Sequence, residues 1–306
     1  MSGYGLPRKT REIQNHHIDS TAWNDFEFRD DDIVIASYAK SGTTWLQHII
    51  AQLLFNGAED LEVAEMSPWV EFRIPPKKFT LSKLATQTHR RFVKTHLPTD
   101  ALVFSERAKY IYIGRDGRDI VWSLYNHHSA ANDNWYTGLN DMPGRVGPPI
   151  EKPSASIKQY YHDWLDRDGY PLWSYWENVR SWWAIKNLPN VLLLHFANLK
   201  QDMPGQIRRI AEYLDIPIDQ RTWESIVLHC EFDYMKQHAK KSVPFYGDMW
   251  NGGFQTFIHN GTNGRWSDVL SQTEIEKYEH IAAEQLGNDC AHWLASGELP
   301  DSTRPA

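Results

Sequence analysis

Five consecutive residues after the first apolar run of the chain carry groups that bind a phosphate: Lys40, Ser41, Gly42, Thr43 and Thr44. Residues 33–36, before them, are apolar and mostly β-branched, as in a strand buried on both faces of a parallel sheet. The apolar positions 45, 49, 53 and 54, after them, recur at helical spacing. A helix that begins here directs unpaired N–H groups and its positive dipole end toward the loop, and Lys40 adds a full charge. The loop therefore predicts a phosphate site; an ordinary polar turn between strand and helix is the alternative.

This loop differs from the nucleotide-triphosphate loop, GxxxxGK[ST], in the position of its lysine. Lys40 precedes Gly42, and no glycine opens the loop. The order of the residues speaks against ATP, so other segments must indicate which phosphate compound binds.

A second anion site is predicted near residues 110–125, YIYIGRDGRDIVWSLY. Asp116 can cap the helix that follows, with Asp119 as its reciprocal partner, and Arg115 leaves the strand just before the cap. Ser123 lies two helical turns beyond the cap and shares the face near Arg115. An arginine fork and a hydroxyl can together bind a second phosphate. The alternative is a surface ion pair between Arg115 and one of the two aspartates.

A general base is predicted at the end of another strand, in RFVKTHLP at 91–98. Residues two apart on a strand share a face, so Lys94 and His96 project together. The lysine charge favours the neutral imidazole, which is the form that a general base requires. The alternative is that His96 is a polar surface residue, as one of the 14 histidines of the chain.

These residues lie at the ends of apolar segments that alternate with helical patterns. Strands are expected at 33–36, 91–95, 110–114 and 191–196, and helices near 117–128, 157–161, 176–187 and 204–214. Such alternation predicts an α/β fold with a parallel sheet flanked by helices on both faces. Ligands in these folds bind outside the carboxyl ends of the strands. We expect a single domain over 1–306, with about the first 20 and the last 10 residues peripheral.

The segment 129–156 interrupts this alternation, because Asn, Asp, Gly and Pro crowd together in it. It predicts a loop without a helix. We place this loop on the substrate side of the site.

Composition limits the function further. The chain has 32 basic and 39 acidic residues, a net charge of −7, so no overall basic field indicates nucleic acid. Cys230 and Cys290 provide neither a disulfide framework nor a zinc spacing.

No secretory leader and no apolar run as long as a membrane span is seen, so we expect a cytoplasmic protein. The pairs at 16–17 and 127–128 lack a third ligand, so we expect no metal and solvent-facing histidines.

Three of these segments, in this order, resemble the cytosolic sulfotransferases: YAKSGTTW at 38–45, KTHLP at 94–98 and GRDGRDIVWS at 114–123. The resemblance extends through 175–196, 230–237 and 257–266, and covers the chain from about Trp23 to about Leu286. It implies a P-loop-like sulfotransferase fold of bacterial type. It also implies a donor, 3′-phosphoadenosine 5′-phosphosulfate (PAPS), whose product is adenosine 3′,5′-bisphosphate (PAP).

The resemblance assigns roles at matching positions. Lys40 would stabilise the leaving phosphate oxygen, His96 would be the base and Lys94 its charged companion. Arg115 and Ser123 would bind the 3′-phosphate that distinguishes PAPS from ATP, and Ser123 is counted among the catalytic residues as well. The remaining donor-site residues would be the loop residues Ser41, Gly42, Thr43 and Thr44 and the adenine-stacking pair Trp45 and Phe232.

The chain departs from the family pattern at several donor positions. His259, Asn260 and Gly261 stand where the family has Arg-Lys-Gly, so two cationic donors to the 3′-phosphate are missing. Arg265 could replace one of them, and the backbone N–H of Gly261 could still serve. Phe196 stands where a tyrosine is usual. The C-terminal dimerisation motif of many animal members is degraded, so no oligomeric state is predicted.

The acceptor is expected to be a small, largely apolar phenol or alcohol. Its aromatic walls would come from Trp69, Phe72, Trp135 and Tyr136, each of which could instead be plain core. Two other classes of function stay open beside the sulfotransferase. One is an ATP-dependent kinase or nucleotidase, and the other is a nucleotide-binding protein without catalysis.

Overall fold

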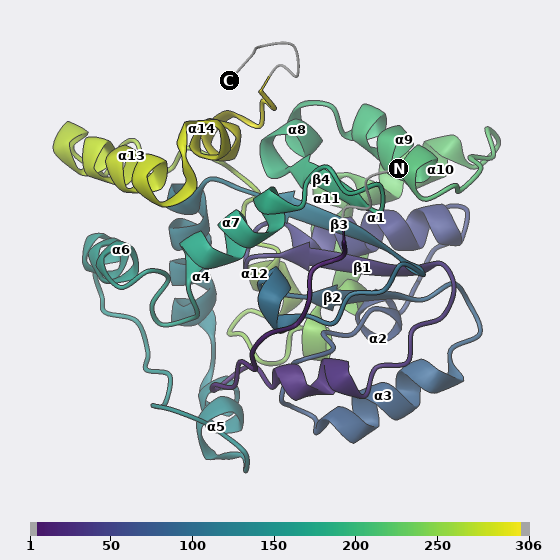
Figure 1. The fold of residues 1–306 in the computed structure, drawn as a ribbon, viewed down its shortest axis with the longest axis horizontal. Helices are drawn as coiled ribbons and strands as arrows, with labels where there is room; N and C mark the ends of the chain where they lie inside the picture. The colour runs from purple at the N-terminus through teal and green to yellow at the C-terminus, as the bar shows by residue number, and fades with distance from the viewer. Residues whose placement is uncertain (1–4, 301–306) are drawn as a thin grey trace.

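The computed structural model describes residues 5–300. At its centre lies a sheet of parallel strands in the order β2-β1-β3-β4 (Figure 1). The strands are β1 (Asp32–Ser37), β2 (Phe92–Thr95), β3 (Ala108–Gly114) and β4 (Val191–His195). The predicted parallel α/β sheet is confirmed, and each strand falls close to its expected range.

Helices cover both faces of this sheet (Figure 1). The longer ones are α1 (Thr43–Leu54), α3 (Lys77–Thr86), α4 (Gly117–Ala130), α5 (Asp133–Asp141), α6 (Ile157–Asp166), α7 (Tyr175–Ala184), α9 (Met203–Tyr213), α10 (Trp223–Cys230), α13 (Gln272–Leu286) and α14 (Asn288–Ser296). The shorter ones are α2 (Val63–Met66), α8 (Phe196–Gln201), α11 (Phe232–His238) and α12 (Phe254–Phe257). Single 3-10 turns are η1 (Ser20–Asn24), η2 (Thr99–Ala101), η3 (Ala239–Ser242) and η4 (Pro244–Gly247).

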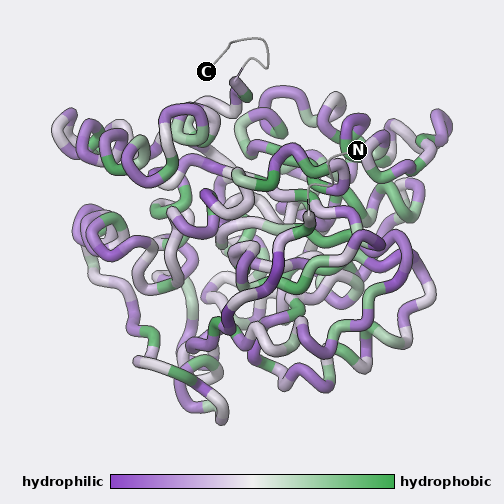
Figure 2. The backbone as a smooth tube through the Cα atoms, in the orientation of Figure 1, coloured by the Kyte–Doolittle hydropathy of each residue, from purple (hydrophilic) through white to green (hydrophobic). Residues whose placement is uncertain are grey.

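Both faces of the sheet are apolar, because successive strand residues point to opposite sides. In β1, Val34 and Ala36 belong to the core shared with α4, α6, α7 and α13. Ile33 and Ile35 belong to the core shared with α1, α9 and α10. Figure 2 shows hydrophobic residues concentrated in the central strands, whereas the outer helices are largely hydrophilic. The uninterrupted apolar runs of the sequence thus correspond to strands buried on both faces.

The segment 129–156 contains a helix, so the prediction of a helix-free loop is wrong. Helix α5 forms because the side chain of Asn132 accepts a hydrogen bond from the N–H of Trp135 and caps it. Its residues Trp135 and Leu139 are buried against other segments. The helix tolerates Gly138, and the prolines of the segment begin only at Pro143, after α5 has ended.

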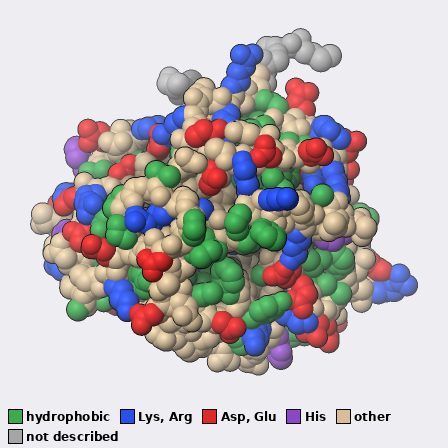
Figure 3. All heavy atoms as spheres, turned by 90° about the horizontal axis from the view of Figure 1, so that it is seen from below, with side chains coloured by type: hydrophobic (Ala, Val, Ile, Leu, Met, Phe, Trp, Pro, Cys, Tyr) green, Lys and Arg blue, Asp and Glu red, His purple; other side chains and the backbone are tan. Residues whose placement is uncertain are grey.

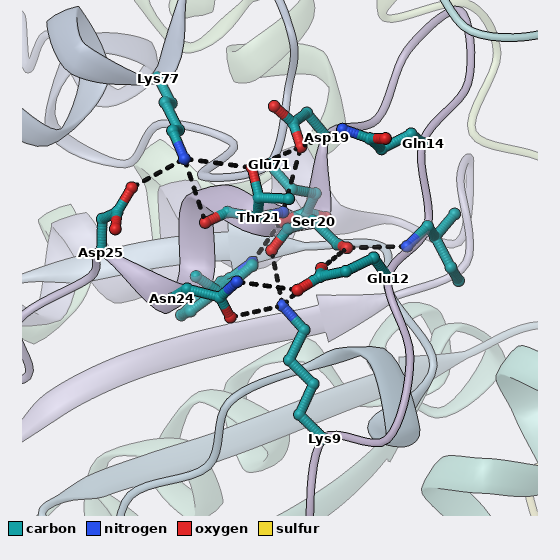
Figure 4. Close-up of polar contacts among 12 residues, drawn as sticks. Lys9, Glu12, Gln14, Asp19, Ser20, Thr21, Asn24, Asp25, Glu71 and Lys77 are labelled. Carbon is teal, nitrogen blue, oxygen red and sulfur yellow. Dashed lines mark hydrogen bonds and ion pairs between the residues drawn. The ribbon is translucent and has the colours of Figure 1, made fainter.

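Residues 9–25, here called the N-terminal strap, are tied down by a polar network (Figure 4). Lys9 Nζ donates to the carbonyl oxygen of Ser20 at 2.9 Å and to Oδ1 of Asn24 at 2.8 Å. Ile18 is 1% exposed and forms a β-bridge with Phe72. Residues 16–18 and 20 are therefore buried rather than in the peripheral position that was expected for them.

Within residues 5–300, no helix is both long and apolar enough to cross a membrane. Figure 3 shows acidic and basic side chains mixed over one face of the molecule, with hydrophobic side chains gathered near its centre. Charges of both signs therefore alternate on the face in view.

Candidate active site

A cavity of about 720 Å³ opens where the carboxyl ends of the strands meet. The predicted donor, base and acceptor residues line it, except for two. Ser41 is 1% exposed and lies behind the cavity wall. Tyr136 packs in the core around α5, where its hydroxyl donates to the carbonyl oxygen of His128 at 2.8 Å. Segments that are far apart in sequence therefore meet in one space.

The loop after β1 has the backbone of an anion cradle. Gly42 has a φ of 104° and is the N-cap of α1, with no side chain capping the helix. A Cβ at Gly42 would lie 2.7 Å from Cδ2 of Phe196, so a larger residue would fill the cradle. The first N–H groups of α1 thus have no side-chain cap, and they lie at the cavity.

Lys40 projects its charge into this cavity without a carboxylate partner among residues 5–300. Its Nζ lies 3.4 Å from Nδ1 of His127 and 4.5 Å from the ring centre of Phe257. Burial, followed by the charges of Arg115 and Lys94, lowers the pKa of Lys40 to about 7. A cation that is buried and unpaired is suited to receive an anion.

Arg115 joins the phosphate loop to the segment after residue 261. Its guanidinium donates to the carbonyl oxygens of Lys40 at 3.1 Å and Thr262 at 3.0 Å, and to Oδ1 of Asn263 at 2.9 Å. It also stacks 4.1 Å from the ring centre of Phe196. With these and a further bond from Nε to Asn263, one hydrogen on Nη1 is left for a ligand.

The alternative ion pair between Arg115 and a neighbouring aspartate is not formed in the described part of the chain. Asp116 caps α4 as predicted, accepting from the N–H of Arg118, and pairs with the Arg118 side chain at 2.7 Å. Asp119 is not the reciprocal partner, because its Oδ1 accepts from the N–H of Gly264 at 2.7 Å. This bond attaches the 262–265 segment to α4.

The altered segment 259–261 closes the donor side of the cavity. Gly261 lies against Phe232, since a Cβ at Gly261 would be 2.6 Å from that ring. His259 has a buried Nδ1 without a partner among the described residues. Asn260 and Arg265 also line the cavity, as does Ser123 from α4.

Lys200, which sequence reasoning missed, lines the same side of the cavity. Its Nζ donates to the carbonyl oxygen of Gly261 at 2.6 Å. Nζ of Lys236 donates to the carbonyl oxygen of His259 at 2.7 Å. The available signal was the position of Lys200 shortly after the carboxyl end of β4, where ligand-binding residues of such sheets gather.

His96 is held as a neutral base. Its Nδ1 lies 2.8 Å from the carbonyl oxygen of Ser37, which can only accept, so we assign the ring proton to Nδ1. Nε2 therefore carries the lone pair, and no partner for it occurs within residues 5–300. Burial, followed by the charge of Lys94, lowers the pKa of His96 to about 3. Both residues line the cavity, so the shared face predicted for them is present.

Glu71, also missed from the sequence, holds the base in position. Its carboxylate accepts from the backbone N–H of His96 at 2.7 Å and from the Thr95 hydroxyl at 3.0 Å. It also accepts from the indole N–H groups of Trp23 and Trp69. Burial raises the pKa of this carboxyl group. The signal in the sequence was a single carboxylate within the apolar run at 69–72.

Aromatic rings form the other half of the cavity. Trp69 and Phe72 stack with ring centres 4.9 Å apart, and the edge of Trp69 meets His96 at 4.7 Å. Trp135 and Trp173 complete the wall. No group of three or more potential metal ligands within residues 5–300 could hold a metal ion.

The paired histidines do not face solvent, so that prediction is wrong. His16 and His17 are each 6% exposed and His128 is 2% exposed, while His127 is half-buried. His16 and His17 belong to the strap, which packs into the core, and His127 and His128 lie on the inner face of α4. The sequence spacing of these residues gave no sign of this, because their burial depends on contacts with distant segments.

Comparison with known proteins agrees with this geometry. A family model, the sulfotransferase domain, matches residues 30–289. A glycolipid sulfotransferase of Mycobacterium tuberculosis is 28% identical over 302 residues, covering 91% of this chain and 92% of that protein. Sulfotransferase 1B1 of Mus musculus is 28% identical over 271 residues, covering 86% and 85%.

Solved structures show the same fold. Mouse sulfotransferase SULT7A1 complexed with PAP superposes with a TM-score of 0.69 at 22% identity, covering 90% of this chain and 92% of that one. Retinol dehydratase in a complex with retinol and PAP gives 0.66 at 21% identity, covering 92% and 86%. Because the family match takes in all strands of the sheet and every segment lining the cavity except that of His17, the chain belongs to the sulfotransferase family.

Proposed function

We propose that this chain transfers a sulfuryl group from PAPS to a hydroxyl group of a small, largely apolar acceptor. One observation carries the proposal: within residues 5–300, a neutral imidazole with an unpaired Nε2 and a lysine without a carboxylate partner share one cavity with a helix N-terminus that no side chain caps. A base, a cation for the leaving group and an anion cradle are the three elements that sulfuryl transfer to a hydroxyl requires.

In the proposed reaction, the acceptor hydroxyl gives its proton to Nε2 of His96 and its oxygen bonds to sulfur. The bond between sulfur and the bridging phosphate oxygen breaks, and PAP is released. Lys40 and the first N–H groups of α1 stabilise the charge that develops on that oxygen. Burial and, after it, the charge of Lys94 keep His96 neutral, and Lys94 would add positive charge beside the sulfuryl oxygens.

The donor residues fit the rest of PAPS. The backbone of the loop at 41–44 would cradle the 5′-phosphate, and Trp45 and Phe232 would flank the adenine. Arg115 has only one hydrogen left for the 3′-phosphate, so Ser123, the N–H of Gly261 and Arg265 must supply the other bonds. Trp69, Phe72 and Trp135 would enclose the apolar body of the acceptor. The cytoplasmic location expected from the sequence stays a prediction.

The proposal is tested by calorimetric titration with PAP and with ADP, followed by a transfer assay with PAPS and 2-naphthol. We expect PAP to bind at least about tenfold more tightly, because a charge-assisted bond to the 3′-phosphate is worth roughly 1.5–3 kcal/mol. Adenosine 5′-phosphosulfate should be a poor donor.

The other outcomes contradict the proposal in different ways. Equal binding of PAP and ADP together with phosphoryl transfer from ATP would favour a kinase or nucleotidase. Tight binding of PAP without transfer to any hydroxyl acceptor would favour a nucleotide-binding protein without catalysis.

A further inference from the structure

Three imidazoles besides that of His96 line the acceptor half of the cavity: His17, His127 and His128. All three lie around the ring of Trp135, with ring centres 5.5, 6.0 and 5.5 Å from it, respectively. We call these three residues the histidine wall. The proposed reaction does not use them, and His17 lies outside the residues matched by the family model.

The hydrogen bonds of the strap determine the proton on His17. Nε2 of His16 lies 2.9 Å from the carbonyl oxygen of Pro171, so it donates and leaves a lone pair on Nδ1 of His16. Nδ1 of His17 contacts that nitrogen and must be the donor. Nε2 of His17 is therefore an acceptor, and no partner for it occurs within residues 5–300.

His127 presents the opposite polarity. In its ammonium form, which is the form that binds an anion, Lys40 can only donate, and its Nζ lies 3.4 Å from Nδ1 of His127. The ring proton of neutral His127 is therefore on Nε2, which is a donor. Burial lowers the pKa of His17 and of His127 well below its ordinary value, so both rings are neutral near pH 7. The wall thus offers one acceptor and one donor.

The wall is held rigidly, as a binding surface requires. Oδ1 of Asn15 accepts from the N–H groups of His17 and Ile18 at 2.8 and 2.9 Å. Nδ1 of His128 lies 2.8 Å from the Tyr160 hydroxyl. Both Nε2 atoms belong to residues that line the cavity, so an acceptor that displaces water from them needs a polar group in its place.

We propose that the histidine wall binds a second hydroxyl group of the acceptor, which donates to Nε2 of His17 and accepts from the Nε2–H group of His127. This inference rests on the proposed function and narrows its substrate class to aromatic or polycyclic diols. Trp69 and Trp173 each pack against both His96 and His17, so the base and the acceptor nitrogen of the wall share the same aromatic surroundings. One hydroxyl is transferred at His96 while the other is held at the wall.

The test compares 2-naphthol with the dihydroxynaphthalene isomers and with the monomethyl ether of the best isomer. We expect the best diol to exceed 2-naphthol about five- to tenfold in kcat/KM, as for one good neutral hydrogen bond. The methyl ether can still accept from His127 but cannot donate to His17, so it should lose most of the gain over 2-naphthol. No preference for any diol, or equal rates for the diol and its ether, would overturn the inference.

Variants of the histidine wall test whether His17 and His127 cause the preference for the diol. In His17→Phe and in His127→Phe, the kcat/KM of the diol should fall to that of 2-naphthol measured in the same variant. His280→Phe, at an exposed position of α13, should retain the preference. Circular dichroism shows whether each variant is folded, and the wild-type comparison decides the matter even if one variant is not. A diol preference that persists in both folded variants would place the second hydroxyl elsewhere and overturn the assignment.

Dissociation constants of the same compounds, measured by calorimetry in the presence of PAP, separate this inference from the proposed function. If no acceptor is sulfated but the diol still binds five- to tenfold more tightly in a His17-dependent way, the transfer proposal fails and the histidine wall stands. If 2-naphthol is sulfated but no diol binds better, transfer stands and the wall does not bind a hydroxyl. Tighter binding of a hydroxynaphthoic acid than of every diol would indicate a carboxylate ligand and overturn the inference.

Discussion

The donor and acceptor halves of the cavity bury ionisable groups in opposite ways. The donor half contains the basic side chains of Lys40 and Arg115, and neither has a carboxylate within salt-bridge distance in the described part of the chain. The acceptor half contains imidazoles that burial keeps neutral, among stacked aromatic rings. The donor half is therefore suited to bind a charged ligand, and the acceptor half is suited to exchange hydrogen bonds with a neutral one.

The two halves also differ in how the chain builds them. The phosphate loop and the first turn of α1 are a single continuous segment. The acceptor walls come from the strap, residues 69–72, α4, α5 and residues 250–257. Recognition of a phosphate can be concentrated in a short motif, since backbone N–H groups and a helix end supply it. An apolar pocket needs walls on all sides, and these must come from several segments.

The largest effect is expected at the boundary between the halves, in His96→Ala. Turnover should fall roughly 10²–10⁴-fold, the typical contribution of a positioned general base. The dissociation constant of PAP, measured by calorimetry, should change by less than about twofold, because Nε2 faces the acceptor. Near-normal turnover would exclude His96 as the base and point to Lys94 or another histidine.

A smaller effect is expected on the donor half in Arg115→Ala. The affinity for PAP should fall roughly 10–100-fold, because charge-assisted bonds are worth roughly 1.5–3 kcal/mol and the guanidinium also holds the carbonyl oxygen of Lys40. Arg115→Lys should recover only part of the loss, since it keeps the charge but not the fork. If Arg115→Lys binds PAP with the affinity of the wild type, the positive charge alone is sufficient and the fork geometry of the guanidinium does not matter at this position.

The pH dependence of donor binding tests the difference in charge directly. In the empty cavity the pKa of Lys40 is about 7, so above pH 7 Lys40 must take up a proton when the anion binds. The affinity for PAP should therefore fall between pH 7 and pH 9, by at most about tenfold per unit, and should be nearly constant from pH 7 to pH 6.

Calorimetry in buffers of different ionisation enthalpy should detect this proton uptake at pH 8, and Lys40→Arg should abolish it. Uptake that is unchanged in Lys40→Arg would assign the proton to another group, of which Lys94, with a pKa lowered to about 8, is the nearest candidate.

The smallest effect concerns the altered segment of the donor half. Arg265→Ala should weaken PAP binding about three- to tenfold, because Arg265 lines the cavity beside residues 259–261 but is not fully buried. Asn260→Lys should strengthen binding or leave it unchanged. Arg221→Ala, which removes an exposed arginine paired with Asp219, is the matched control. A sharp gain in Asn260→Lys with no loss in Arg265→Ala would mean that Arg265 serves another purpose.

The sequence by itself determined the strands and the local motifs. Apolar β-branched runs, the turn at Gly42 and the cap at Asp116 depend on neighbouring residues, so their patterns survive in the linear order. The alternation of side chains along β2, continued to the residue after it, was enough to bring Lys94 and His96 to one cavity. Helix α5 was missed because one capping residue, Asn132, outweighed the poor composition of its surroundings.

Only the tertiary structure decided the environment of the acceptor half. Contacts between segments far apart in sequence determine the burial of the two histidine pairs. They also determine the hydrogen bond from His96 to Glu71 and the packing of Tyr136 in the core. The tautomers depend on such contacts too, since the proton on His17 depends on a carbonyl oxygen at Pro171. Burial and hydrogen-bond partners are properties of the packed chain, and they set both the charge and the polarity of these side chains.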